Sequence, residues 1–365
     1  MSSPHMAIHH DPQRISHLIR RLRPSFAHPS RRRALTTSPS TAAPPVSARI
    51  SHRLSSSILT VPTCPPSRCA CAAMPPGLDI DRERKMGGTM PPYAQHVVVR
   101  TGRDDWGSRI EDEDVSVEGT GINFARSLKE LPERPILITN CSLPSNPDPG
   151  YTSVYVFPQH VRVPKIPHTP EAHEAFVSQF INSKSALAQK LQAKKMFVKN
   201  PEGEFDETGF PIPKDKERLI YKSNASPTIL ICGHNSRDSR CGILGPLLHA
   251  EFYSYVHGRT RLPADDERST GYRFHGLQPV SPIRHTKVAL TSHIGGHAFA
   301  GNVVIYLPKK FKMGNGKVSP LAGKGIWYGR VEPRHVWGIM EETVQRGRVI
   351  EELQRGIHEP GGVGW

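Results

Sequence analysis

A short apolar run at residues 228–231 leads directly into a polar loop and then a helical segment, and this order constrains the fold most. The run has the length and character of a buried β-strand. Residues 232–242 are polar and rich in glycine, and residues 243–256 have the composition of a helix. A strand that passes through a loop into a helix is the building unit of α/β layers. The sequence therefore predicts an α/β protein.

Other strands and helices are predicted on both sides of this unit. Apolar runs predict strands at 96–100, 135–139, 153–157, 287–291, 302–307 and 325–331. Thr169-Pro170-Glu171 supplies the cap, first-turn proline and acid of a helix start, and 334–346 predicts a terminal helix. We expect three parts, namely a disordered N-terminal segment and linker (1–90), a smaller α/β lobe (91–215) and a C-terminal domain (216–365) compatible with a thioredoxin-like layer.

The positive charge is concentrated at the N-terminus. The formal net charge is +15, yet residues 1–77 contain ten Arg, no Lys and only one acidic residue, Asp11. The remaining chain is only mildly basic, which argues against a nucleic-acid partner. An Arg-rich, Ser-rich, acid-poor start is typical of a mitochondrial presequence, and residues 14–22 could form its amphipathic face. We therefore expect import into the mitochondrial matrix by the import machinery, and the short apolar runs predict no membrane span.

Two pairs of possible ligands stand out in the C-terminal domain. Cys232 and Cys241 are spaced C-x8-C, and His293 and His297 are spaced H-x3-H. Each pair is predicted to lie in a loop at the end of a strand, where side chains can converge. Thiolate and imidazole together suit zinc or iron–sulfur chemistry. A third alternative is a dithiol that uses the two cysteines, although eight intervening residues are far from the C-x-x-C spacing of such sites.

Four stretches carry a resemblance to a known family: ICGHNSRDSRCGILGPLLHAEF, SHIGGHAFAGNVVIY, IWYGRVEPRHV and RGRVIEELQRG. The chain resembles the sucrase/ferredoxin-like family in these residues. The resemblance implies a thioredoxin-like ferredoxin fold and a [2Fe–2S] cluster. It carries the four cluster ligands over to Cys232, Cys241, His293 and His297.

The resemblance also implies a function. We expect a mitochondrial [2Fe–2S] protein of electron transfer or thiol redox homeostasis, rather than an enzyme with its own substrate. Its partners would be an electron donor or acceptor protein and the iron–sulfur assembly machinery. The alternatives are a structural zinc-binding interaction module and a thioredoxin-type dithiol protein.

Three further predictions concern single residues. Cys141 follows a predicted strand and is expected to be a buried cysteine rather than a reactive thiol. His234, inside the cysteine loop, is expected to be an exposed loop histidine. Trp327 and Tyr328 on a predicted strand are expected to pack in the core.

Overall fold

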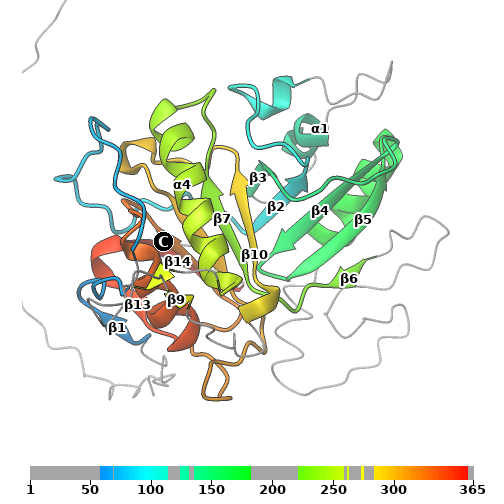
Figure 1. Cartoon of the computed structure of the whole chain (residues 1–365). Coiled ribbons are helices and arrows are strands. Elements are labelled where there is room, and N and C mark those ends of the chain that lie inside the picture. The colour runs from blue at the N-terminus through cyan, green and yellow to red at the C-terminus, as the bar shows by residue number, and fades with distance from the viewer. Residues whose placement is uncertain are drawn as a thin grey trace, which may run out of the picture. The chain divides into compact units, whose positions relative to one another are not determined.

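The computed structural model describes residues 58–68, 70–113, 124–130, 135–181, 221–258, 261–262, 273–274 and 283–360. Ten strands form one mixed sheet in the spatial order β14-β12-β11-β7-β10-β3-β2-β4-β5-β6 (Figure 1). The strands of this sheet are β2 (Gln95–Arg100), β3 (Ile136–Cys141), β4 (Tyr151–Phe157), β5 (Val161–Pro167), β6 (Lys222–Ser223), β7 (Thr228–Cys232), β10 (Lys287–Thr291), β11 (Val303–Tyr306), β12 (Gly325–Tyr328) and β14 (Gln354–His358).

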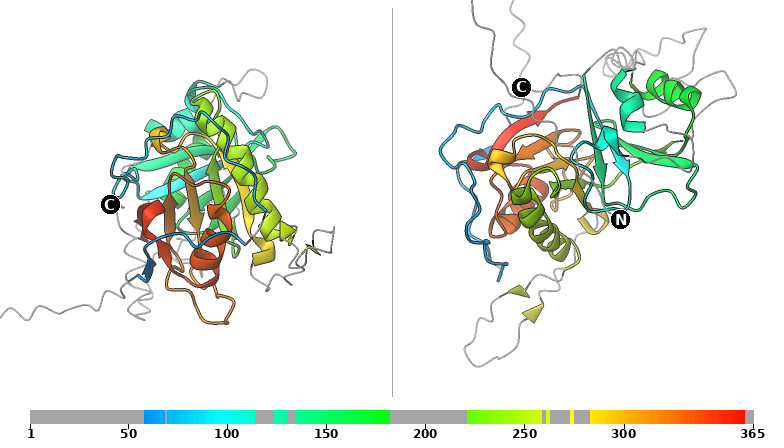
Figure 2. Two further views of the ribbon diagram at one scale, coloured as in Figure 1. Left: turned by 60° about the vertical axis from the view of Figure 1, so that its left-hand side comes forward. Right: turned by 90° about the horizontal axis from the view of Figure 1, so that it is seen from above.

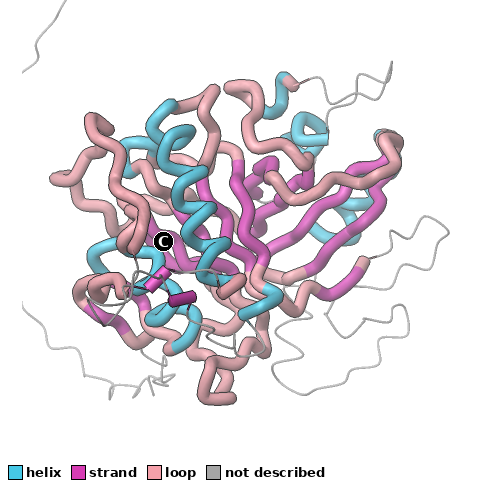
Figure 3. The backbone as a smooth tube through the Cα atoms, in the orientation of Figure 1, coloured by secondary structure: helices cyan, strands magenta, loops and turns pink. Residues whose placement is uncertain are grey.

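Shorter elements surround the sheet (Figure 3). Two small two-stranded sheets pair β1 (Thr60–Val61) with β13 (Val349–Ile350) and β8 (Arg261–Leu262) with β9 (Arg273–Phe274). The helices are α1 (Phe124–Glu130), α2 (Pro170–Phe176), α4 (Ser239–Val256) and α5 (His335–Ile339), with short turns η1 (Ile110–Asp112) and η4 (His297–Phe299).

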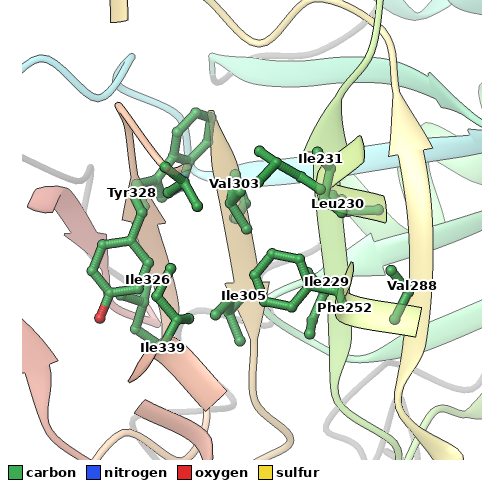
Figure 4. Close-up of a cluster of buried hydrophobic side chains, with 14 of the residues drawn as sticks. Ile229, Leu230, Ile231, Phe252, Val288, Val303, Ile305, Ile326, Tyr328 and Ile339 are labelled. Carbon is green, nitrogen blue, oxygen red and sulfur yellow. The ribbon is translucent and has the colours of Figure 1, made fainter. Parts of the chain in front are cut away.

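Strand β7 lies in the middle of the core. All five of its residues are buried, because β10 pairs with it in parallel on one side and β11 pairs with it antiparallel on the other. Ile229, Leu230 and Ile231 pack with the neighbouring strands in the cluster of Figure 4. A strand buried on both faces reads as a continuous apolar run, which is why residues 228–231 were recognisable in the sequence.

Helices cover both faces of the sheet. Helix α4 packs on β7 and β10, whereas α1 and α2 lie on the opposite face (Figure 2). Strand β2 shows the division, since Val97 and Val99 join the cluster of α1 and α2 and Val98 joins the cluster of α4. Helix α2 begins as predicted, with the Thr169 side chain accepting a hydrogen bond from the backbone N–H of Ala172.

A buried chain of hydrogen bonds crosses the sheet. Trp327 Nε1 donates to Tyr93 Oη at 2.8 Å, which bonds to Tyr306 Oη at 2.7 Å. Tyr306 Oη is 2.9 Å from His96 Nδ1, and His96 Nε2 is 2.8 Å from Thr139 Oγ1. The chain therefore joins β2 and β3 to β11 and β12 through polar groups that all have partners.

Described residues between 58 and 93, most of which lie in the stretch expected to be linker, pack along the C-terminal elements. Thr60 pairs with Val349 in the parallel β1–β13 sheet, and the Cys64 backbone N–H donates to Glu352 at 2.7 Å. Ile80, Met86, Met90 and Tyr93 are buried. The described part of the chain before β2 is thus integral to the core.

The predicted α/β class is confirmed by this mixed sheet with its helices. Helix α4 starts at Ser239, four residues earlier than predicted, so Cys241 lies in its first turn and not in a loop. Strands of both predicted lobes join the same sheet; the domain boundaries and the thioredoxin-like ferredoxin assignment stay predictions. Within the described residues, no helix is long and apolar enough to cross a membrane. Residues 14–22 lie outside the described part of the chain.

Buried histidines predict a loss of stability in mild acid. Burial lowers the pKa of His96 and His160 to about 3 and that of His173 to about 4. An unfolded chain has histidine pKa values near 6.5, so below that pH the unfolded state binds more protons and is favoured. Stability should be fully present above about pH 6.5 and fall toward pH 4.5, by roughly 1–2 kcal/mol for each such histidine near pH 5.

Urea unfolding followed by circular dichroism between pH 7.5 and 4.5 measures this loss. His96→Gln should flatten the pH dependence, whereas the same change at exposed His285 should leave it unaltered. A stability that is constant across the window would contradict the neutral, buried state of these imidazoles.

Candidate functional site

The two predicted cysteines come together where β7 ends and α4 begins. Cys232 is the last residue of β7 and Cys241 lies in the first turn of α4, and each is 1% exposed. Hydrogen bonding with Cys241, and then with His293, lowers the pKa of Cys232 well below 9. The same contact with Cys232, together with burial, raises the pKa of Cys241. The contact between the two sulfurs therefore lowers the pKa of one thiol and raises that of the other.

Helix α4 can approach this strand end because Gly245 has no side chain. A Cβ atom at Gly245 would lie 2.6 Å from the Gly233 Cα and 2.7 Å from the Cys232 carbonyl oxygen. Both are backbone atoms, which cannot move without shifting the end of strand β7. The close contact fixes Cys241 over Cys232.

The histidine loop follows β10 at the same edge of the sheet. In the parallel register Thr291 lies opposite Cys232, so His293 is two residues beyond the strand end that carries the cysteine. The His293 and His297 rings are 5.5 Å apart between centroids. Thus Cys232, Cys241 and His293 are brought together, whereas His297 is exposed and its ring contact is with His293.

Arg355 holds the histidine loop in place. The side chain is 1% exposed and comes from β14. Its guanidinium donates to the carbonyl oxygen of Gly295 at 3.1 Å, to Asn302 Oδ1 at 2.7 Å and to the carbonyl oxygen of Thr89 at 2.7 Å. Burial lowers its pKa to about 10, and the neighbouring thiols of Cys232 and Cys241 offset part of that shift. We did not predict this residue, although it lies in the quoted stretch RGRVIEELQRG.

His234 is buried, so the prediction of an exposed loop histidine is wrong. It is 1% exposed, and its Nε2 lies 3.0 Å from the carbonyl oxygens of Trp106 and Gly107. Its Nδ1 accepts a hydrogen bond from the His293 backbone N–H at 3.0 Å. A neutral imidazole with hydrogen on Nε2 satisfies both contacts. His234 therefore ties the cysteine loop to the histidine loop and to residues 106–107.

A cavity of about 910 Å³ opens beside this site, between β3, α1, η1 and the two loops. His234, Arg237, Ser292 and His293 of the two loops line it. The other lining residues are Ser108, Arg109, Ile110, Glu111, Ala125, Lys129, Pro135, Ile136, Leu137 and Ile138. The cavity thus combines charged and polar side chains with apolar ones.

Known proteins resemble this chain over most of its length. The sucrase/ferredoxin-like family model matches residues 86–356. The chain belongs to the sucrase/ferredoxin-like family. Two similar proteins, both named altered inheritance of mitochondria protein 32, come from Debaryomyces hansenii (30% identity, 81% of this chain and 95% of that protein) and Meyerozyma guilliermondii (27%, 81% and 94%). A Saccharomyces cerevisiae protein of the same name is 36% identical over 35% of this chain and 31% of its own length. No solved structure matches the chain.

The predicted redox function of this sucrase/ferredoxin-like chain is wrong. Among the described residues, no group of three or more His, Cys, Asp or Glu side chains is arranged to hold a metal ion. The sulfurs of Cys232 and Cys241 hydrogen-bond to each other instead, and His297 is exposed. The described residues therefore provide no metal-holding group for the predicted [2Fe–2S] electron-transfer role or for the zinc alternative, and family membership does not by itself support the dithiol alternative. The assignment of the four individual residues as cluster ligands stays a prediction.

The other single-residue predictions are confirmed. Cys141 is fully buried, and burial raises the pKa of its thiol to about 12, so it is not a reactive group. Trp327 and Tyr328 have no exposed surface and pack in the core of the sucrase/ferredoxin-like fold.

The hydrogen bonds of Arg355 predict a large effect of its removal. Arg355→Met should lower the free energy of unfolding by at least about 3 kcal/mol, because buried carbonyl oxygens lose their donors. Arg355→Lys should lower it less, since lysine keeps the charge and cannot reproduce the planar fork. Urea unfolding measures both.

Arg103→Met is the matched control. Arg103 is 57% exposed in its side chain and pairs with Glu113, so its loss should change stability by less than about 0.5 kcal/mol. Equal urea midpoints for Arg355→Met and Arg103→Met would show that Arg355 does not support the histidine loop.

Proposed function

We propose that this sucrase/ferredoxin-like protein binds a small organic anion in the cavity beside the cysteine and histidine loops. The observation that carries the proposal is the cavity itself, whose lining combines basic and imidazole side chains with apolar residues of the β3 segment. Binding cavities of this kind are mostly apolar, with a few placed polar groups that orient the ligand.

The lining of the cavity has an excess of positive charge. Arg109, Lys129 and Arg237 line the cavity with a single carboxylate, Glu111. Glu111 is already paired with Lys129 and lies 3.7 Å from Arg109. Arg237 contacts only a neutral acceptor, the Ser108 carbonyl oxygen at 3.4 Å, and forms no ion pair with any described residue. Its guanidinium is therefore the cation best placed to receive the charge of a ligand.

His293 adds a polar group to the same lining. Its imidazole lines the cavity and also hydrogen-bonds to Cys232. Because the His293 backbone N–H donates to His234 Nδ1 at 3.0 Å, the residue is held in a defined position.

The apolar part of the lining suits an apolar portion of a ligand. Pro135, Ile136, Leu137 and Ile138 of the β3 segment line it, together with Ile110. A carboxylate with a chain of several carbons would pair its charge with Arg237 and pack its chain against the apolar residues. The ligand class we propose is thus a medium-chain organic acid.

We also propose that the protein acts in mitochondria, in the matrix. Support comes from relatives whose name refers to the inheritance of mitochondria and from the Arg-rich, acid-poor N-terminal sequence.

Removing the charge of Arg237 tests the cavity proposal. Full-length protein should bind octanoate and bind octanol more weakly, because octanol has no charge for Arg237. Arg237→Gln should raise the dissociation constant of octanoate by about tenfold or more, because a charge-assisted hydrogen bond is lost. The same change should leave the dissociation constant of octanol unchanged. Isothermal titration calorimetry measures both.

Arg284→Gln supplies the control, since Arg284 is exposed and does not line the cavity. The proposal fails if octanoate and octanol bind equally, or if Arg237→Gln and Arg284→Gln have the same effect.

The location is tested by microscopy of a fluorescent fusion in fungal cells. The full chain should enter mitochondria, whereas a chain that lacks residues 14–22 and keeps β1 should remain in the cytosol because the amphipathic segment is lost. Mitochondrial import of the shortened chain would disprove the presequence.

A further inference from the structure

Three basic side chains surround Tyr155 on one face of the sheet. They are Arg100 from β2, Arg162 from β5 and Lys287 from β10. Arg162 is the register partner of Tyr155, and the Arg100 Cζ and Lys287 Nζ atoms lie 5.7 and 5.8 Å from the centre of the Tyr155 ring. We call these three residues the basic cluster.

The basic cluster lies on the face opposite α1 and α2. On β4, Val154 and Val156 pack in the cluster of those helices, so the intervening Tyr155 points to the other face. On β5 the same alternation places Val161 and Val163 toward the helices and Arg162 away from them. None of the three basic residues lines the cavity described above. The two features are therefore separate.

No described carboxylate neutralises the basic cluster. None of its members takes part in an ion pair within the described residues. Arg100 donates to Ser153 Oγ at 3.0 Å and Lys287 donates to Asn224 Oδ1 at 2.7 Å, and both acceptors are neutral. Arg82, Arg240, Arg334 and Arg346 in the described part of the chain are each paired with a carboxylate, so the unpaired basic cluster needs another explanation.

Two guanidinium nitrogens of the cluster are buried without a partner. The Nε atoms of Arg100 and Arg162 have no hydrogen-bond acceptor and almost no exposed surface. Buried donors of this kind are uncommon because each forfeits its hydrogen bonds to water. Both are N–H groups of cations, which an anion would satisfy best.

The basic cluster also repels itself. Burial, followed by the charge of Arg162, lowers the pKa of Arg100. Burial, followed by the charges of Arg162 and Arg100, lowers the pKa of Lys287. Lys222 on β6 is the register partner of Arg162 and adds a further positive charge at the edge. Holding these cations together without a counter-ion therefore lowers the free energy of unfolding.

We propose that Arg100, Arg162 and Lys287 form a binding site for the phosphate group of a small phosphorylated ligand. Two guanidinium groups and an ammonium supply several donors and enough charge for a dianion, and guanidinium geometry matches phosphate oxygens. The three cations surround one aromatic ring and do not form a long track, so the site fits one phosphate rather than a nucleic-acid backbone.

The experiment uses the full chain and inorganic phosphate, with sodium chloride at matched ionic strength as the control. Phosphate should raise the melting temperature and chloride should not. Arg162→Gln should raise the melting temperature without phosphate by about 2 °C, because a repelling charge is removed, and should abolish the shift caused by phosphate. An arginine that only supported the fold would lower the melting temperature when replaced.

Two further variants and one vesicle assay complete the test. Arg284→Gln and Arg237→Gln should keep the full phosphate shift, the second because it belongs to the cavity proposed for organic acids. Failure of octanoate binding in the cavity would leave this result unaffected. The proposal is overturned if phosphate and chloride act alike, if Arg162→Gln keeps the phosphate shift, or if the chain binds phosphatidic acid vesicles and not free phosphate.

Discussion

The parallel register between β7 and β10 determines where the chemistry of this protein can lie. Because Thr291 lies opposite Cys232, both strands end at the same edge of the sheet, and the loops that follow them meet there. The shared edge brings the thiol pair, the His293 imidazole and the wall of the cavity within reach of one another. A shift by one residue would turn the side chains at these strand ends to the other face.

Remote side chains then hold the two loops in their positions. Arg355 reaches the histidine loop from β14, and His234 joins the same loop to residues 106–107. Both are fully engaged in hydrogen bonds and buried, unlike the basic cluster on the sheet face. The contrast separates two uses of positive charge. Arg355 has its donors satisfied by carbonyl and amide oxygens, whereas Arg100 and Arg162 each keep a buried Nε without a partner.

The elements that sequence reasoning found are those with a local signal. The apolar run of β7, the cap of α2 at Thr169 and the burial of Trp327 are dictated by neighbouring residues, and the structure contains them as expected. The first turn of α4 was missed because Ser239, Arg240 and Gly242 look like loop, and its stability comes from the Asp238 cap. Arg355, His234 and the cavity depend on partners 50 or more residues away, which no local pattern reveals. The redox function expected from the ligand types is wrong, because the described residues contain no group of three or more such side chains arranged to hold a metal ion, and spacing in the sequence does not fix that arrangement.

The pairing of β1 with β13 has a consequence for how the chain reaches its native state. Thr60 near the start of the described chain pairs with Val349 near its end. The Tyr93 hydroxyl likewise forms its hydrogen bonds with Tyr306 and Trp327, which come much later in the sequence. Contacts of such high sequence separation form slowly, because a long loop must close before they stabilise anything. During synthesis the early segment has to wait, unpaired, until nearly all of the polypeptide has been made. Its apolar residues are exposed in that interval, and exposed apolar residues of an incomplete chain are prone to aggregation unless a chaperone binds them.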